Sequence, residues 1–114
     1  MTSQKLKFGV VTLQNVSWEE LVKRWRYLDS TGFDSAWVGD HFVNYENPTE
    51  SWFDGWTLLP ALASQTSRIR IGIISSIPLR NPAMLARQAL TVDHISNGRL
   101  DLGLGTGAPG SIDP

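Results

Sequence analysis

Short apolar segments alternate with longer segments of helical periodicity along the chain, and this alternation constrains the fold most. The run Leu6–Leu13 is almost wholly apolar, which is typical of a parallel strand that is buried on both faces. Similar runs at 35–38 and 69–75, and the segment that begins at 99, predict three further strands. Strands separated by helices of this length form a parallel sheet with right-handed crossovers. The sequence therefore predicts an α/β fold.

Three helices are predicted between these strands. Ser17 and Glu20 have the spacing of a capping box, and an apolar stripe follows them. The second helix is expected over 52–66. Pro82 suits the first turn of the third helix, and Gly98 suits its end. The residues of the third helix that are expected to face the sheet are Leu85, Ala89, Val92 and Ile95.

Two architectures fit these elements, an open doubly wound sheet and part of a (β/α)8 TIM barrel. A nucleotide-binding doubly wound sheet carries a glycine-rich phosphate loop after its first strand, and residues 14–17 contain no glycine. The TIM barrel is therefore favoured. Because a complete barrel has about 250 residues, residues 1–114 are expected to be the N-terminal part of a single barrel domain. They would cover its first half, strands 1–4 with helices 1–3, with no internal boundary.

The composition restricts the class of partner. Ten basic and eleven acidic residues give a formal net charge of -1, so there is no electrostatic case for nucleic acid or an anionic membrane. The sequence has no cysteine and no signal-peptide pattern, which together predict a cytoplasmic protein. No apolar segment approaches the roughly 20 residues that span a bilayer. We find no paired metal ligands and expect no metal.

Candidate functional residues follow the ends of strands, where the active sites of barrels lie. Asp40 and His41 come directly after the second strand. Histidine transfers protons near neutral pH, and a neighbouring carboxylate could set the imidazole tautomer. The pair could equally be structural, with Asp40 capping a loop. The glycines at 103–107, with Thr106 among them, could let backbone amides approach a flat ring or an anion, or could simply form a tight turn. His94 is expected on a helix surface.

Three segments of the chain, GFDSAWVGDHF, ALASQTSRIRIGI and RNPAMLARQALTVDHISNGRLDLGLGTG, follow an opening KFGV strand and together cover almost all of it. In these segments and their order the sequence resembles the bacterial luciferase-like monooxygenase superfamily. The resemblance implies a TIM-barrel oxidoreductase that transfers hydride to, or inserts oxygen into, a small organic substrate. It implies FMN, reduced by a partner flavin reductase, or the deazaflavin coenzyme F(420) as the cofactor. We also expect a homodimer.

The resemblance assigns roles to residues at the ends of strands two and three. Asp40 and His41 match the pair that borders the cofactor ring in the deazaflavin branch, where the histidine transfers a proton or orients the ring. This pair favours the deazaflavin, although it also occurs among FMN members. Ile74 and Ser75 match a bulge where relatives hold a non-prolyl cis peptide behind the ring, a strained bond.

Further assignments come from the end of strand four. Thr106 and Gly107 match positions near the ring or ribityl chain of the cofactor. Two departures argue against a sugar-phosphate dehydrogenase of the deazaflavin branch. Tyr45, which we also expect to bind the cofactor, occupies the neighbourhood in which those enzymes have a tryptophan. Ala108-Pro109 stand where they carry a catalytic glutamate.

The resemblance also implies that strands five to eight close the barrel and supply most of the phosphate site. We therefore expect residues 1–114 alone to bind cofactor poorly and to lack turnover. The leading hypothesis is the N-terminal portion of a flavin- or deazaflavin-dependent oxidoreductase. One alternative is a non-catalytic half-barrel that assembles through its open sheet edges. Another is an independent doubly wound binding domain, against which the missing phosphate loop argues.

Overall fold

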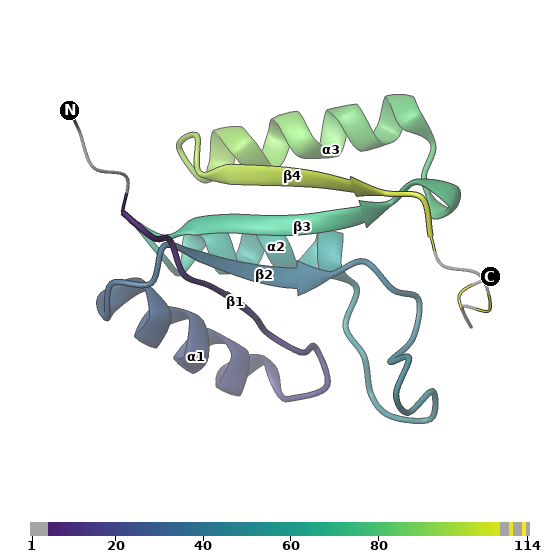
Figure 1. Ribbon diagram of the computed structural model, residues 1–114, viewed down its shortest axis with the longest axis horizontal. Coiled ribbons are helices and arrows are strands. Elements are labelled where there is room, and N and C mark those ends of the chain that lie inside the picture. The colour runs from purple at the N-terminus through teal and green to yellow at the C-terminus, as the bar shows by residue number, and fades with distance from the viewer. Residues whose placement is uncertain (1–4, 108–109, 111–112, 114) are drawn as a thin grey trace.

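The computed structural model describes residues 5–107, 110 and 113, and strands and helices alternate along them. In chain order the elements are β1 (Gly9–Val11), α1 (Trp18–Ser30), β2 (Ser35–Gly39), α2 (Gly55–Ser64), β3 (Arg70–Ser76), the 3-10 helix η1 (Ile77–Leu79), α3 (Pro82–Ile95) and β4 (Leu100–Gly105). The predicted α/β alternation is confirmed (Figure 1). Two elements are shorter than expected. Strand β1 does not reach Leu6 or Leu13, and helix α2 begins only at Gly55.

The four strands form one parallel sheet in the order β1-β2-β3-β4. Each strand pairs with the next one along the chain, as in a TIM barrel, whereas a doubly wound sheet reverses its order at a switch point. The helices cover one face of this sheet (Figure 1), with α1 against β2, α2 against β3 and α3 against β4. This arrangement agrees with the predicted half-barrel.

The hydrophobic core lies between the helices and one face of the sheet. Alternate residues of β3, Ile71 and Ile73, are fully buried there. The stripe of α1 joins the same core through Leu21, Trp25 and Leu28, as its periodicity predicts. In α3, Leu85 and Val92 are buried and Ala89 packs against the core, but Ile95 is 44% exposed, so its inward placement is wrong. Ile95 is the last residue of α3.

The ends of the helices follow local sequence signals. The Ser17 hydroxyl accepts a hydrogen bond from the Glu20 amide at 3.1 Å. The Glu20 carboxylate accepts one from Arg24 Nε at 3.0 Å, so only half of the capping box forms. Asn81 caps α3, and α3 ends at a turn in which Gly98 has φ 79°, a left-handed conformation that favours glycine.

The other face of the sheet is open and rich in glycine. Val11 and Ile74 point to this face and are 68% and 60% exposed, so the expectation that the first strand is buried on both faces is wrong. The reason is geometric, since this face is covered only where a sheet closes into a barrel. Trp37 lies across Gly72, where a Cβ would sit 2.4 Å from the indole ring. Within the described part of the chain, no helix has the length and apolar character needed to cross a bilayer.

Candidate active site

A groove of about 590 Å³ runs over the C-terminal ends of the strands on the open face of the sheet. Its lining residues are Gly9, Val11, Trp37, Val38, Gly39, Asp40, His41, Ile74, Ser75, Ser76, Gly105, Thr106 and Gly107. The structure thus brings together all the predicted site residues except Tyr45. The Tyr45 ring lies beside the groove, with its centroid 5.3 Å from that of the His41 ring.

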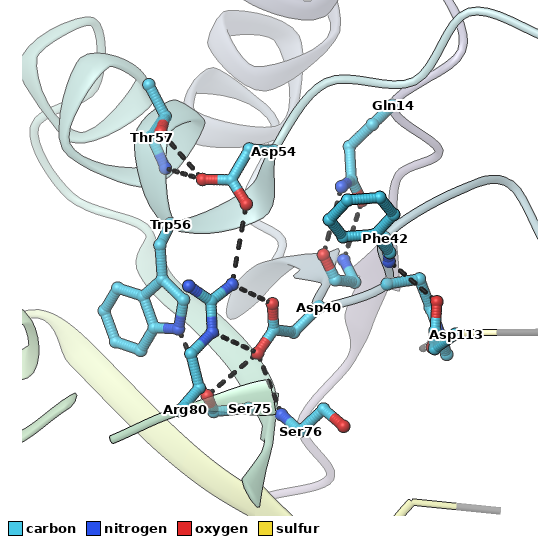
Figure 2. A network of polar contacts seen from close by, with 12 residues as sticks. Gln14, Asp40, Phe42, Asp54, Trp56, Thr57, Ser75, Ser76, Arg80 and Asp113 are labelled. Carbon is cyan, nitrogen blue, oxygen red and sulfur yellow. Dashed lines mark hydrogen bonds and ion pairs between the residues drawn. The ribbon is translucent and has the colours of Figure 1, made fainter. Parts of the chain in front are cut away.

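His41 occupies the point where β2 passes into the long loop that precedes α2. Its ring is partly exposed and places Nδ1 2.8 Å from Oδ2 of Asp113. The other carboxylate oxygen of Asp113 accepts a hydrogen bond from the Phe42 amide at 2.7 Å (Figure 2). The His41 carbonyl accepts a hydrogen bond from Trp52 Nε1 at 3.0 Å. The Asp113 carboxylate therefore holds the imidazole, and the Trp52 hydrogen bond holds the backbone of the same residue.

Asp40 turns to the helix-covered side of the sheet and is 4% exposed. Its Oδ2 accepts hydrogen bonds from the Ser75 hydroxyl and the Ser76 amide, both at 2.9 Å, and its carboxylate forms an ion pair with Arg80 (Figure 2). Burial by itself raises the pKa of this carboxyl, but the hydrogen bonds from Arg80, Ser76 and Ser75 outweigh it, so the pKa lies below its ordinary value. Asp40 is therefore held ionised, and it ties the end of β2 to the turn after β3.

Arg80 was not identified from the sequence, although it stands at the centre of this network. Its guanidinium contacts Asp40 and also reaches Oδ1 of Asp54 at 3.5 Å. Hydrogen bonding to Asp40 raises the pKa of Arg80 further above its ordinary value, against the opposing effect of burial. Since Asp54 is the N-cap of α2, Arg80 connects the first and last residues of the 40–54 loop that carries His41.

A second side chain that sequence reasoning missed holds the same loop from the opposite side. Gln14 is fully buried. Its Nε2 donates to the carbonyls of Gly39 and Phe53 at 3.0 Å each, and its Oε1 accepts from the Gly39 amide at 2.8 Å. The sequence signal was weak, because a glutamine after a strand is more often exposed. Gln14 and Arg80 together define the base of the loop.

The cis peptide and the bulge expected at Ile74 and Ser75 of the third strand are wrong. None of the described peptide bonds is cis, and β3 keeps a continuous register with both neighbours, so neither the cis peptide nor the bulge is present. Each residue is matched by one partner on the adjoining strands, which leaves no extra residue to bulge. Ser75 is fully buried and accepts a hydrogen bond from Trp56 Nε1 at 3.1 Å. Ile74 instead projects into the groove.

The residues after β4 form the far wall of the groove. Thr106 and Gly107 are exposed there, and Gly107 has φ 82°, which favours glycine. Gly105 lies beside Ile74 at the bottom of the groove. A Cβ at Gly105 would be 3.4 Å from Cγ2 of Ile74. Ala108 and Pro109 lie outside the described residues. His94 is exposed in the last turn of α3, as expected.

The groove suits a flat ring system better than a phosphate or a metal. Its floor has no Cβ at Gly39 and Gly105, and its walls are largely apolar, so a planar ring could approach the backbone closely. His41, Ser76 and Thr106 supply polar groups around it. Among the described residues that line the groove there is no Lys or Arg. Across the described part of the chain, no cluster of side chains has the composition of a metal site.

A parallel β/α sheet with a groove at the carboxyl ends of its strands is the architecture of a TIM-barrel enzyme. The family model of the luciferase-like monooxygenases matches residues 5–113. The chain belongs to this family, which confirms the resemblance.

Three relatives illustrate the similarity. The F(420)-dependent glucose-6-phosphate dehydrogenase of Amycolatopsis mediterranei is 39% identical over 83 residues, which are 69% of this chain and 24% of that protein. The coenzyme F(420)-dependent tetrahydromethanopterin reductase of Methanopyrus kandleri superposes with a TM-score of 0.78 at 28% identity, over 92% of this chain and 28% of that one.

The third relative is the oxygenating constituent of 3,6-diketocamphane monooxygenase from Pseudomonas putida, solved in complex with FMN. It superposes with a TM-score of 0.74 at 25% identity, over 92% of this chain and 30% of that one. The chain therefore spans less than a third of the length of these relatives. Both deazaflavin- and flavin-dependent proteins are among them.

Proposed function

We propose that this chain is the N-terminal part of a flavin- or deazaflavin-dependent oxidoreductase that acts on a small organic molecule by hydride transfer or oxygen insertion. The observation that carries the proposal is the groove, in which a partly exposed histidine stands beside a glycine floor at the carboxyl ends of parallel strands. Relatives that use F(420) or contain FMN support the same conclusion.

In this proposal the cofactor ring supplies the redox chemistry, and the residues of the groove hold and orient it. Ile74 packs against one face of the ring, and Gly105 lets that face approach the strand backbone. Thr106 donates a hydroxyl hydrogen bond at the rim. His41 transfers a proton at the ring edge or orients the ring. Asp40 takes no direct part, because its carboxylate is committed to Arg80 and the two serines.

The substrate proposed here is not a sugar phosphate, although one relative is a glucose-6-phosphate dehydrogenase. Tyr45 departs from the tryptophan expected of such enzymes, and Ala108-Pro109 stand where those enzymes carry a catalytic glutamate. If the cofactor is FMN, a separate reductase is a proposed partner, because one relative is the oxygenating constituent of its enzyme. A homodimer and a cytoplasmic location stay predictions of the sequence.

The test uses the natural full-length protein, beginning with its intact mass. A mass several times 12.7 kDa would provide the complete barrel in which to measure cofactor binding. We expect either FMN or F(420) to bind with micromolar affinity or better. His41→Ala is then expected to lower turnover by about 10²–10⁴-fold, the usual effect of losing an acid–base group. His94→Ala, a histidine on the surface of α3, is the matched control and should leave turnover unchanged. Absence of binding by both cofactors would refute the proposal.

The assembly alternative rests on the open sheet edges. Leu102 and Leu104 of β4 are 42% and 58% exposed, and Val11 of β1 is 68% exposed, which leaves apolar side chains at both edges. A natural mass near 12.7 kDa, with a stable stoichiometric oligomer and no cofactor affinity, would favour this alternative. We also propose that residues 1–114 alone bind cofactor poorly, and micromolar affinity of the isolated fragment would contradict this.

A further inference from the structure

We propose that Asp113 is a positioning residue that holds the His41 ring as the Nδ1–H tautomer and so presents Nε2 to the groove as a proton acceptor. The inference deepens the proposed function and rests on it for its kinetic consequence. Its structural part concerns only the ring and the carboxylate, so it has a direct test of its own.

The carboxylate of Asp113 contacts two adjacent residues, His41 through its ring and Phe42 through its backbone amide. Oδ2 lies 2.8 Å from His41 Nδ1, while Oδ1 accepts a hydrogen bond from the Phe42 amide at 2.7 Å. The Asp113 side chain is only 10% exposed. A carboxylate held by a backbone amide on one oxygen is kept in one orientation, so the other oxygen meets Nδ1 at a fixed place.

The chemistry of the two groups determines the tautomer. An ionised carboxylate only accepts hydrogen bonds, so the nitrogen that it contacts must carry the hydrogen. In a neutral imidazole the other nitrogen then has a lone pair. Since Nδ1 faces Asp113, Nε2 on the far side of the ring is left as the acceptor, and the ring itself lines the groove.

The structure also explains why this role does not belong to Asp40, the carboxylate next to His41 in the sequence. Asp40 points to the helix-covered side of the sheet and binds Arg80, Ser75 and Ser76. The Asp40 carboxylate is therefore turned to Arg80 and the two serines, whereas the His41 ring contacts Asp113. Asp113 reaches His41 from a segment 72 residues away, beyond the end of β4, and therefore links the two sides of the groove.

Asp113→Asn is the decisive variant, because it keeps the size of the side chain and changes its hydrogen bonding. An amide can donate to Nδ1 and thereby place the imidazole hydrogen on Nε2, which turns the groove-facing nitrogen from an acceptor into a donor. Asp113→Ala removes the contact altogether and releases the tautomer from its constraint.

The first measurement is the nitrogen NMR spectrum of ¹⁵N-histidine in the natural full-length protein, at a pH where the ring is neutral. We expect His41 to show a protonated Nδ1 in the wild type and a protonated Nε2 in Asp113→Asn. His94, on the surface of α3, serves as the internal reference and should not change. A wild-type His41 with its hydrogen on Nε2, or an unchanged tautomer in Asp113→Asn, would overturn the proposal.

The second measurement is steady-state kinetics with the cofactor that binds. We expect Asp113→Asn to lower kcat at least about tenfold while KM changes less than about threefold, because the ring stays in place and only its hydrogen moves. Equal losses in Asp113→Asn and Asp113→Ala with unchanged tautomer would mean a merely structural contact. If neither FMN nor F(420) binds, the proposed function fails, while the NMR result still decides the tautomer.

Discussion

Removal of Arg80 is expected to destabilise the protein strongly, because this side chain neutralises a buried carboxylate. Its guanidinium is 21% exposed, whereas the Asp40 carboxylate that it neutralises is 2% exposed in its side chain. Arg80→Met keeps the aliphatic stem but leaves a buried carboxylate with only the Ser75 hydroxyl and the Ser76 amide as donors. An uncompensated buried charge is the costly element of this variant.

The loss of stability in Arg80→Met depends on the charge that the substitution removes and on the hydrogen-bond donors that Asp40 keeps. Breaking a buried ion pair by removing one partner costs about 3–5 kcal/mol. Because two neutral donors to Asp40 remain, we expect Arg80→Met to lower the free energy of unfolding by about 3 kcal/mol, at the lower end of that range. The additional contact with Asp54 adds little, since that carboxylate is half exposed at 3.5 Å and such pairs contribute about 0–1 kcal/mol.

The assay is urea unfolding of the full-length protein, followed by circular dichroism, as a double-mutant cycle. Asp40→Asn combined with Arg80→Met should be less destabilised than the sum of the single variants, with a coupling of about 1–3 kcal/mol. Asp54→Asn is the matched control, because asparagine caps a helix as well as aspartate does and only the charge is lost. A loss below about 1 kcal/mol in Arg80→Met, or no coupling in the cycle, would refute the reasoning.

Three further predictions concern stability and cofactor binding. Burial raises the pKa of Asp40, but its hydrogen bonds lower this pKa more, so the folded value lies below the ordinary one. The contribution of ionised Asp40 to the free energy of unfolding is therefore complete above the unfolded pKa of about 3.9 and is lost as the pH falls through the lower folded value. The stability difference between the wild type and Asp40→Asn should shrink in urea titrations below about pH 4. Gly72→Ala would place a Cβ 2.4 Å from the Trp37 ring, so we expect it to lower the free energy of unfolding by about 1–3 kcal/mol in thermal unfolding. Gly105→Ala has its nearest contact at 3.4 Å and should leave stability nearly unchanged. It should instead weaken cofactor binding in a fluorescence titration. Asn81→Ala removes a side chain that accepts from two amides at the start of α3 and should cost about 1 kcal/mol; Asn81→Asp should restore it, and equal stability of all three proteins would contradict the capping role.

The elements that could be predicted from the sequence are those whose signals are local. The stripe of α1 and its Ser17 cap, or the Asn81 cap of α3, involve residues within one or two helical turns, and a 3.6-residue period directly records which side of a helix is buried. The Leu6–Leu13 run was less informative. Its apolar residues suggested a long strand, but pairing with β2 is confined to Gly9–Val11, because pairing depends on a neighbour that is distant in the sequence.

For the candidate site, the positions of the residues could likewise be predicted from the sequence, but their partners could not. The rule that barrel sites lie at the carboxyl ends of strands led to His41 and Thr106, and the resemblance to the luciferase-like family added Ile74. The structure places all three along one groove. The rule says nothing about which partner each side chain meets. Adjacency in the sequence suggested that Asp40 could set the His41 tautomer, whereas the structure pairs Asp40 with Arg80 and His41 with Asp113.

The sequence by itself determined the alternation of strands and helices, the family, and the strand ends at which chemistry is expected. Only the tertiary structure decided the polar partners, because Gln14, Arg80 and Asp113 contact residues that lie 25, 40 and 72 positions away. Such contacts have no period or spacing in the chain. They arise when parallel strands bring their carboxyl ends to one edge of the sheet, and the energy of each contact depends on the burial that this packing creates.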